Sequence, residues 1–247
     1  MKLKKSINPL IYILLLCPVL TADTFKPNYH FENVSINYLN WSKGTQSRSA
    51  QKDFAYLEVE GGAGWDWGEF YMFFDIENPT KSYNDTSAES MRFAFKPVID
   101  ITLLDNLSLH IQDYNLQSKD FYISNIIVGL SYDIKTDFGL WIRPFIGPHY
   151  QLSTYYSGFN GYVGGWVFDY MFNILQTDFS ISQWHEFEFD RDKEDGYDEH
   201  TGTQGALCFW WHPIKEITTG IQYRYASYNL GSTSYQNGSI YSLKYNF

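Results

Sequence analysis

Cysteine is almost absent from this sequence, with Cys17 and Cys208 the only two among 247 residues. Because Cys17 lies in an amino-terminal segment that we expect to be removed, the mature chain keeps a single cysteine. A chain with one cysteine forms no intramolecular disulfide and has no cysteine-based zinc site.

Basic residues are also scarce. Lysine and arginine total 18 against 28 aspartates and glutamates, which gives a formal net charge of −10. Neutralising phosphates requires clustered Lys and Arg, so the composition argues against nucleic-acid binding. Charged residues make up 19% of the chain and aromatic residues another 19%, a balance that excludes a disordered chain.

Long apolar runs are missing after the first 22 residues. Residues 1–22 contain three early lysines, an apolar run over 10–20 and then Thr21-Ala22, which is the layout of a secretory signal peptide. We expect cleavage at its end and one mature domain over 23–247. The run is too short for a membrane-spanning helix, which needs ~20 residues. An exported membrane protein without such a helix crosses the membrane as a closed β-barrel.

The mature chain is rich in segments where apolar and polar residues alternate with a period of two. Over 69–77 one face carries Phe70, Met72, Phe74 and Ile76, and the other carries Glu69, Tyr71, Phe73 and Asp75. Twelve segments follow this pattern: 33–42, 53–62, 68–77, 89–99, 106–116, 121–134, 138–151, 160–173, 177–189, 203–212, 216–226 and 238–247. Tilted transmembrane strands need ~9–11 residues. We therefore predict an all-β fold, a twelve-stranded antiparallel transmembrane β-barrel of the bacterial outer-membrane type.

The connections between these segments alternate in length. Tight connections occupy 64–67, 135–137 and 212–215, and longer polar ones occupy 43–52, 78–88, 190–202 and 227–237. Outer-membrane barrels alternate short periplasmic turns with long external loops in the same way. An even number of strands also returns the carboxy terminus to the side where the chain began, so we expect both ends in the periplasm.

A soluble β-sandwich also alternates apolar and polar residues. Two features favour the barrel. The apolar faces carry aromatic residues near strand ends, as interfacial girdles do: Trp41, Phe70, Tyr150, Trp166, Trp211 and Tyr245. The opposite faces carry charged groups in mid-strand: Glu58, Asp75, Arg92, Arg143, Asp169, Glu186 and Arg224. A wet lumen holds such charges at a lower cost than the interior of a sandwich.

The chain closes on the alternating segment 240–247, which ends on the aromatic Phe247. This ending resembles the carboxy-terminal signal that outer-membrane proteins present to their assembly machinery. We expect contact with the barrel assembly machinery through Phe247, and outer-membrane lipids around the folded barrel.

One block of the sequence has a specific spacing. Tyr56-Leu57-Glu58-x-Glu60 is followed after six residues by Trp67-x-x-Phe70-Tyr71-x-x-x-Asp75. The block resembles the nucleoside-specific channel family of outer-membrane proteins, Tsx with the OmpK-like receptors. Weaker likenesses follow in order: Arg92-Phe93 before Pro97, Val128-Gly129-Leu130 before Asp133, Asn160-Gly161-Tyr162, and Tyr245-Asn246-Phe247. Asn160 stands where the family pattern has an acidic residue. The resemblance implies a passive channel that favours nucleosides.

A nucleoside channel needs flat aromatic platforms and polar groups that bind weakly enough to release the solute. Within the resemblance, the residues expected to contact solute in the lumen are Tyr56, Glu58, Tyr71, Phe73, Asp75, Arg92, Arg143, Trp184 and Arg224. Glu60, Trp141 and Asn125 lie on the same faces. The alternative is that the charged groups brace a narrow barrel through Glu–Arg pairs across the lumen, and bracing is the favoured role of the three arginines.

Three roles stay open at this point: a passive solute channel, a surface receptor whose loops bind bacteriophage as in OmpK-like members, and a barrel whose lumen is filled by side chains. We expect no enzymatic activity, because Ser108 and His110 share the lumen face and no orienting carboxylate is evident from the sequence. We expect no cofactor and no metal site, since the acidic run 190–199 has its glycine at the wrong position for a calcium loop.

Overall fold

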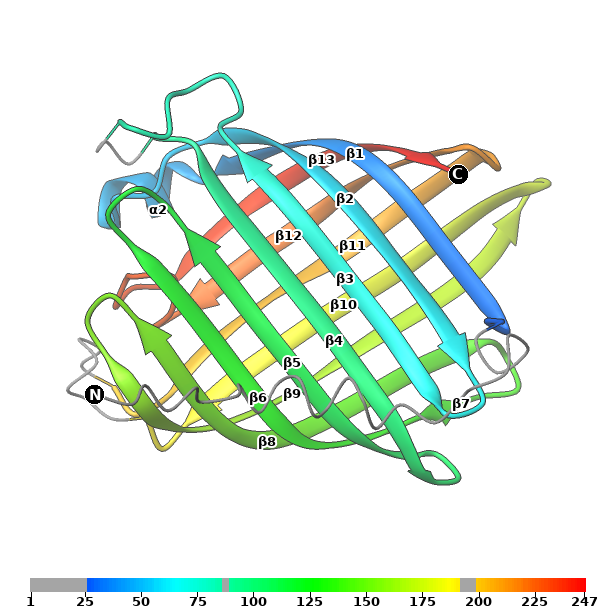
Figure 1. Ribbon diagram of the computed structural model, residues 1–247. Coiled ribbons are helices and arrows are strands. Elements are labelled where there is room, and N and C mark those ends of the chain that lie inside the picture. The colour runs from blue at the N-terminus through cyan, green and yellow to red at the C-terminus, as the bar shows by residue number, and fades with distance from the viewer. Residues whose placement is uncertain (1–25, 86–88, 192–198) are drawn as a thin grey trace, which may run out of the picture.

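The chain folds into one antiparallel sheet that closes into a barrel (Figure 1). The computed structural model describes residues 26–85, 89–191 and 199–247, and the predicted signal peptide lies outside them. β1 (Tyr29–Trp41) pairs with β13 (Gln236–Asn246), and β6 (Tyr122–Tyr132) pairs with β8 (Leu140–Ser153), so hydrogen-bonded pairing continues round the whole barrel.

The other elements have these bounds: β2 Phe54–Trp65, β3 Gly68–Glu77, β4 Arg92–Leu104, β5 Leu107–Gln117, β7 Ile134–Lys135, β9 Ser157–Ile174, β10 Thr177–Phe189, β11 Gly202–Ile214, β12 Ile217–Ser227 and α2 Lys43–Arg48. Because β7 is a two-residue addition beside β8, the barrel has twelve long strands, which confirms the predicted fold. Within the described ranges, no helix is long and apolar enough to cross a membrane.

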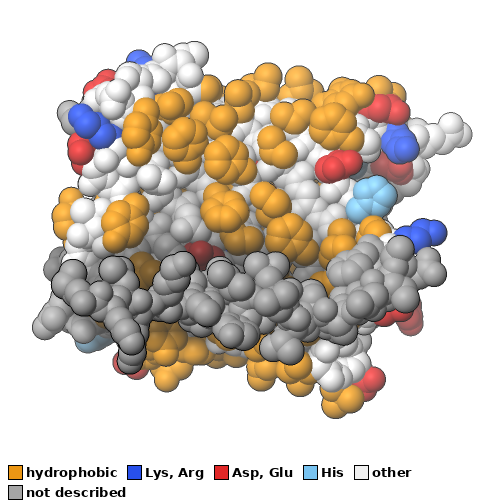
Figure 2. Space-filling view, viewed as in Figure 1, with side chains coloured by type: hydrophobic (Ala, Val, Ile, Leu, Met, Phe, Trp, Pro, Cys, Tyr) orange, Lys and Arg blue, Asp and Glu red, His pale blue; other side chains and the backbone are white. Residues whose placement is uncertain are grey.

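Each strand presents one face to the lumen and the other to the outside. In β1, Asn33, Ser35 and Asn37 are buried inside the barrel, whereas Ile36 and Tyr38 between and beside them are exposed. Figure 2 shows hydrophobic side chains covering much of the outer wall in one view. This arrangement inverts a soluble protein, because the lipid-facing surface is apolar and the interior is polar.

The two ends of the barrel differ. We call one the short-turn end: its connections include 66–67, 105–106, 175–176 and 215–216. The first residues of β1 and the last residues of β13 lie there, where Figure 1 marks the carboxy terminus on the right. The other, the long-loop end, has the connections 42–53, 78–91, 190–201 and 228–235 and the short helix α2. Two further connections at this end, 118–121 and 154–156, are short, so the predicted alternation in length holds for most connections.

The turn after β9 is tight and conformationally demanding. Leu175 and Gln176 both have positive φ, at 51° and 63°. Two residues with positive φ form the type I′ turn whose twist matches that of the strands it joins. Asparagine and glycine are the residues that usually adopt it, so Leu175 and Gln176 are unusual residues for this turn, although the break between the predicted segments 160–173 and 177–189 falls here.

Trp41 was expected among the outer aromatic residues, and the structure corrects this. Its side chain is only 4% exposed and packs inside the barrel with Leu39, Tyr56 and Ile240. Parity explains the difference, because Trp41 is in step with the inward residues of β1, Asn33 to Leu39. Tyr150, Trp211 and Tyr245, by contrast, are exposed on the outer wall as predicted.

Candidate functional site in the barrel lumen

The lumen wall near the long-loop end holds an ion pair and, beside it, a further carboxyl group. Arg92 of β4 pairs with Glu77 of β3 at 2.5 Å, and its guanidinium lies 5.4 Å from the ring centre of Phe54. Asp75 is the next inward residue of β3 and is 9% exposed. Its Oδ1 atom has no hydrogen-bond partner in the part of the chain that the structure describes.

Farther along the same wall, one lysine contacts two glutamates. Lys244 of β13 donates to Glu60 at 2.6 Å and lies 4.0 Å from Glu58. The hydroxyl of Tyr71 donates to Glu60 at 2.8 Å, and Ser35 donates to Glu58 at 3.1 Å. These groups come from neighbouring strands of one wall, so they form a hydrogen-bonded lining there.

The middle of the lumen contains contacts between opposite walls. Lys96 of β4 donates to Glu186 of β10 at 2.7 Å. Gln112 of β5 donates to the same carboxylate at 2.9 Å, and Gln204 of β11 donates to its other oxygen at 3.1 Å. We call Lys96 and Glu186 the cross-lumen bridge.

Trp184 and Arg224 lie beside this bridge. The guanidinium of Arg224 is 4.6 Å from the ring centre of Trp184, and Lys96 Nζ is 6.0 Å from it. Arg224 donates to the side-chain oxygen of Gln204 at 2.8 Å and to two backbone carbonyls. Among the described residues it forms no ion pair, so the expected Glu–Arg bracing does not apply to Arg224.

Toward the short-turn end, three carboxylates surround Arg143. Its guanidinium contacts Glu69 at 2.5 Å, Asp133 at 2.6 Å and Asp100 at 3.1 Å. Asp100 also lies 2.9 Å from Nδ1 of His110. These five residues form the Arg143 cluster, whose ion pairs are of the kind that the bracing interpretation predicts.

The family described as "Nucleoside-specific channel-forming protein, Tsx" matches residues 36–247. The chain belongs to the Tsx family. This agrees with the resemblance in the 56–75 block and extends it over nearly the whole mature chain.

Solved structures agree with the fold of this Tsx-family chain. The NanC porin is 14% identical, with a TM-score of 0.52 over 86% of this chain and 98% of that one. A bacterial polysaccharide outer membrane secretin is 9% identical, with a TM-score of 0.46 over 90% of this chain and 99% of that one. The outer membrane channel DcaP of Acinetobacter baumannii is 9% identical, with a TM-score of 0.34 over 89% and 96%. The last two scores are too low to add to the argument.

The family and the fold together make this Tsx-family chain a passive channel of the outer-membrane barrel type. The lumen fits such a channel, because its side chains are charged, amide and aromatic groups rather than a continuous apolar core. In the parts of the chain that the structure describes, no group of three or more His, Cys, Asp or Glu side chains is placed to hold a metal ion.

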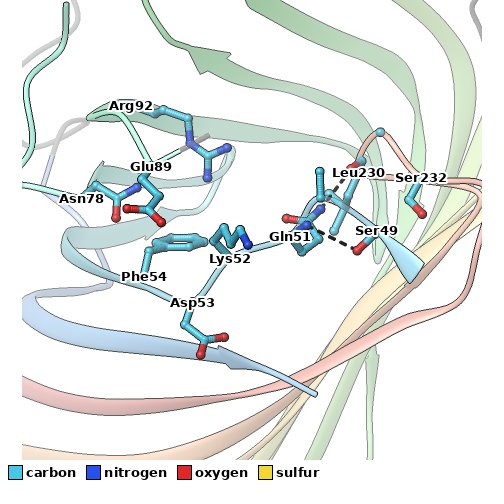
Figure 3. Close-up of a pocket in the computed structure, with 12 residues that line it drawn as sticks. Ser49, Gln51, Lys52, Asp53, Phe54, Asn78, Glu89, Arg92, Leu230 and Ser232 are labelled. Atoms are coloured by element: carbon cyan, nitrogen blue, oxygen red, sulfur yellow. Dashed lines mark hydrogen bonds between the residues drawn. The ribbon is translucent and has the colours of Figure 1, made fainter. Parts of the chain in front are cut away.

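A pocket opens beside the lumen at the long-loop end of this Tsx-family barrel (Figure 3). Its volume is about 170 Å³, and its lining comes from the segment 49–54, from β4 and its preceding loop, and from the loop 230–232. Figure 3 shows Arg92, Asn78 and Glu89 on one side and Leu230 and Ser232 on the other. Arg92 therefore joins the pocket to the lumen wall.

The sequence-predicted residues all come from strands that line the lumen, but they do not form one site. Tyr56, Glu58, Tyr71, Phe73 and Asp75 lie on β2 and β3, whereas Trp184 and Arg224 lie across the lumen and Arg143 lies toward the short-turn end. Of the additional residues, Trp141 donates to Asp133 and Asn125 lies 3.1 Å from His149.

Sequence reasoning missed the two lumen lysines. Lys96 and Lys244 both occupy inward positions, in step with Arg92 on β4 and with Ser242 on β13. The alternation within 89–99 and 238–247 contains this signal. Only arginine was considered as an inward basic residue, so the two lysines were not predicted, although lysine fills the same positions.

Proposed function

We propose that this Tsx-family barrel carries nucleosides by passive diffusion, with Phe73 and Asp75 as a pair of solute contacts. The observation that carries the proposal is the Oδ1 atom of Asp75, which is buried in the lumen wall without a hydrogen-bond partner among the described residues. A hydroxyl of a passing solute supplies the missing donor. The family description supports the same solute class.

Phe73 is the inward residue of β3 next to Asp75, where an aromatic ring can contact the same solute. Two residues apart on β3, their side chains share the lumen face at a separation of about 7 Å along the strand. A base stacks on the ring while the ribose hydroxyls reach the carboxylate. Stacking contributes roughly 1–3 kcal/mol per base. A hydrogen bond to a charged group adds ~1.5–3 kcal/mol, which leaves binding weak once the cost of association is subtracted.

The test is single-channel recording in planar bilayers with added nucleosides, with free bases and free sugars as control solutes. Phe73→Ala and Asp75→Asn are expected each to reduce nucleoside block of the ion current by about tenfold, a loss of ~1.4 kcal/mol. Phe138→Ala and Asp105→Asn make the same chemical changes at turns of the short-turn end and serve as matched controls. If both lumen variants fold and conduct but are blocked by nucleosides as strongly as wild type, Phe73 and Asp75 are not the solute contacts.

One observation favours a second role. Because the cross-lumen bridge joins opposite walls, it fits a barrel whose lumen is filled by its own side chains. The same bilayer recording separates the two functions: steady conductance from folded wild-type protein supports the channel, and its absence supports the filled barrel.

We also propose the orientation that the connections indicate, with the short-turn end in the periplasm and the long loops outside the cell. Protease or antibody access to Phe247 in intact cells tests it, since access from outside would reverse the topology. Contact of the Phe247 segment with the barrel assembly machinery and use of the long loops by bacteriophage stay predictions from the sequence.

A further inference from the structure

We propose that the cross-lumen bridge, Lys96 with Glu186, is the selectivity constriction of this channel. The solutes that pass it most readily are neutral molecules with a flat ring and hydrogen-bonding groups. The solute class rests on the proposed nucleoside function, whereas the position of the constriction rests on the geometry of the lumen alone.

The bridge crosses the passage. Around the barrel, β4 and β10 are five steps apart through β5, β6, β8 and β9, and seven steps apart the other way. The 2.7 Å contact of Lys96 with Glu186 therefore joins nearly opposite walls. Gln112 and Gln204 hold the carboxylate from either side, on β5 and β11. A solute that travels along the lumen has to displace this bridge or squeeze past it.

The other described lumen ion pairs span fewer strand steps, and the longest, Arg143 of β8 with Glu69 of β3, covers four. Lys244 and Glu60 lie on β13 and β2, which are separated only by β1, and Arg92 and Glu77 lie on adjacent strands. Such pairs line one wall. The cross-lumen bridge is thus the described ion pair whose loss widens the passage most directly.

The charges around the bridge disfavour charged solutes of either sign. An anion that approaches Lys96 or Arg224 also meets the carboxylate of Glu186, and a cation attracted to Glu186 meets both basic groups. A neutral solute avoids both repulsions. Its acceptors take the ammonium protons of Lys96, its donors reach Glu186, and its ring reaches the face of Trp184.

The bridge is also built from groups that are easy to displace. Lysine carries its charge on a flexible stem with three rotatable donors, so Lys96 can exchange Glu186 for a solute oxygen. Arg143, by contrast, is held by three carboxylates, on β3, on β4 and just after β6, and is suited to bracing. We therefore expect Lys96, rather than an arginine, to change its contacts when a solute passes.

Ion conductance tests the constriction without any solute. Lys96→Met and Glu186→Gln keep side-chain size while they remove the ion pair. We expect each to raise single-channel KCl conductance about twofold, because without the ion pair the two side chains are no longer held together across the narrowest point of the passage. The exchange variant Lys96→Glu with Glu186→Lys restores the pair and is expected to return the conductance to the wild-type level. Lys215→Met, at an exposed turn, is the matched control.

Folding of every variant is checked by the heat-modifiable gel shift of a folded barrel. If Lys96→Met does not fold, Lys96→Gln keeps a hydrogen-bonding head group and replaces it. Wild-type conductance in folded variants of both positions overturns the constriction. If the exchange variant conducts as much as the single variants, the ion pair is not what narrows the passage.

Solute block then tests the class of solute. Adenosine and adenosine monophosphate are compared as blockers of the ion current, since they share a ring and differ in charge. We expect wild type to favour adenosine and Glu186→Gln to shift the ratio about tenfold toward the monophosphate, equivalent to ~1.4 kcal/mol. An unchanged ratio overturns the proposed solute class. If conductance rises in the variants while no nucleoside blocks wild type, the constriction stands and the nucleoside function fails.

Discussion

At the scale of single residues, Arg143 shows how the polar lumen is held together. One guanidinium contacts the carboxylates of Glu69, Asp100 and Asp133, which come from β3, from β4 and from the residue after β6. Its ring neighbour Trp141 lies 5.0 Å from the guanidinium carbon. Because the Arg143 side chain is 9% exposed, water does little to replace these contacts.

Arg143→Met is therefore expected to destabilise the barrel by about 3–5 kcal/mol, the usual cost of removing one partner from a buried ion pair. Urea unfolding of the detergent-solubilised protein, followed by tryptophan fluorescence, measures the change. Arg48→Met, in the exposed last turn of α2, is the control and is expected to cost less than about 0.5 kcal/mol. Equal unfolding midpoints for Arg143→Met and wild type would contradict the bracing role.

At the scale of secondary-structure elements, pairing of β6 with β8 skips the short β7. Gly129 and Gly147 lie against each other in these two strands. A Cβ atom on Gly129 would collide with the carbonyl oxygen of Ile146, and one on Gly147 would lie 2.8 Å from that of Val128. Backbone atoms cannot move aside as a flexible side chain does, so this approach requires glycine.

Gly129→Ala is expected to weaken this pairing and destabilise the barrel by about 1–3 kcal/mol, as overpacking usually does. The temperature of the heat-modifiable gel shift should fall. Gly158→Ala in β9 is a matched control, because its nearest neighbour is the side-chain hydroxyl of Tyr156 at 3.2 Å, which can shift. Should both variants melt at the same temperature, the tight approach of the two strands would not limit stability.

At the scale of the whole molecule, the lumen has an excess of negative charge. In the contacts described above, eight carboxylates accompany five basic groups: Glu58, Glu60, Glu69, Asp75, Glu77, Asp100, Asp133 and Glu186, with Arg92, Lys96, Arg143, Arg224 and Lys244. The sequence as a whole carries a net charge of −10, so the outside of the barrel does not reverse this sign.

We expect the open channel to prefer cations to anions, because a lumen of one net charge concentrates counter-ions. The measurement is the reversal potential under a KCl gradient across a planar bilayer. The preference should weaken as salt rises from ~0.1 M to ~1 M, since the screening length falls from about 10 Å to 3 Å. A reversal potential of the opposite sign would show that the paired carboxylates contribute little to the field in the lumen.

Local sequence pattern was sufficient for the architecture. A period of two, repeated twelve times with polar connections, specifies strands with one apolar and one polar face, and the absence of long apolar helices left only a closed barrel. Parity along β3 likewise predicted that Tyr71, Phe73 and Asp75 share the lumen face. The prediction was wrong for Trp41, because it was grouped with the outer aromatic residues by its type and not by its position in the alternation.

The pairing of residues across the lumen was decided only by the tertiary structure. Alternation states which face a side chain occupies, but the stagger of strands round the barrel determines what it meets there. Lys96 and Glu186 are 90 positions apart in the chain, and no local pattern links them. For the same reason, the sequence alone offered Arg224 as a brace, and closure of the barrel instead placed it over Trp184 with no carboxylate partner among the described residues.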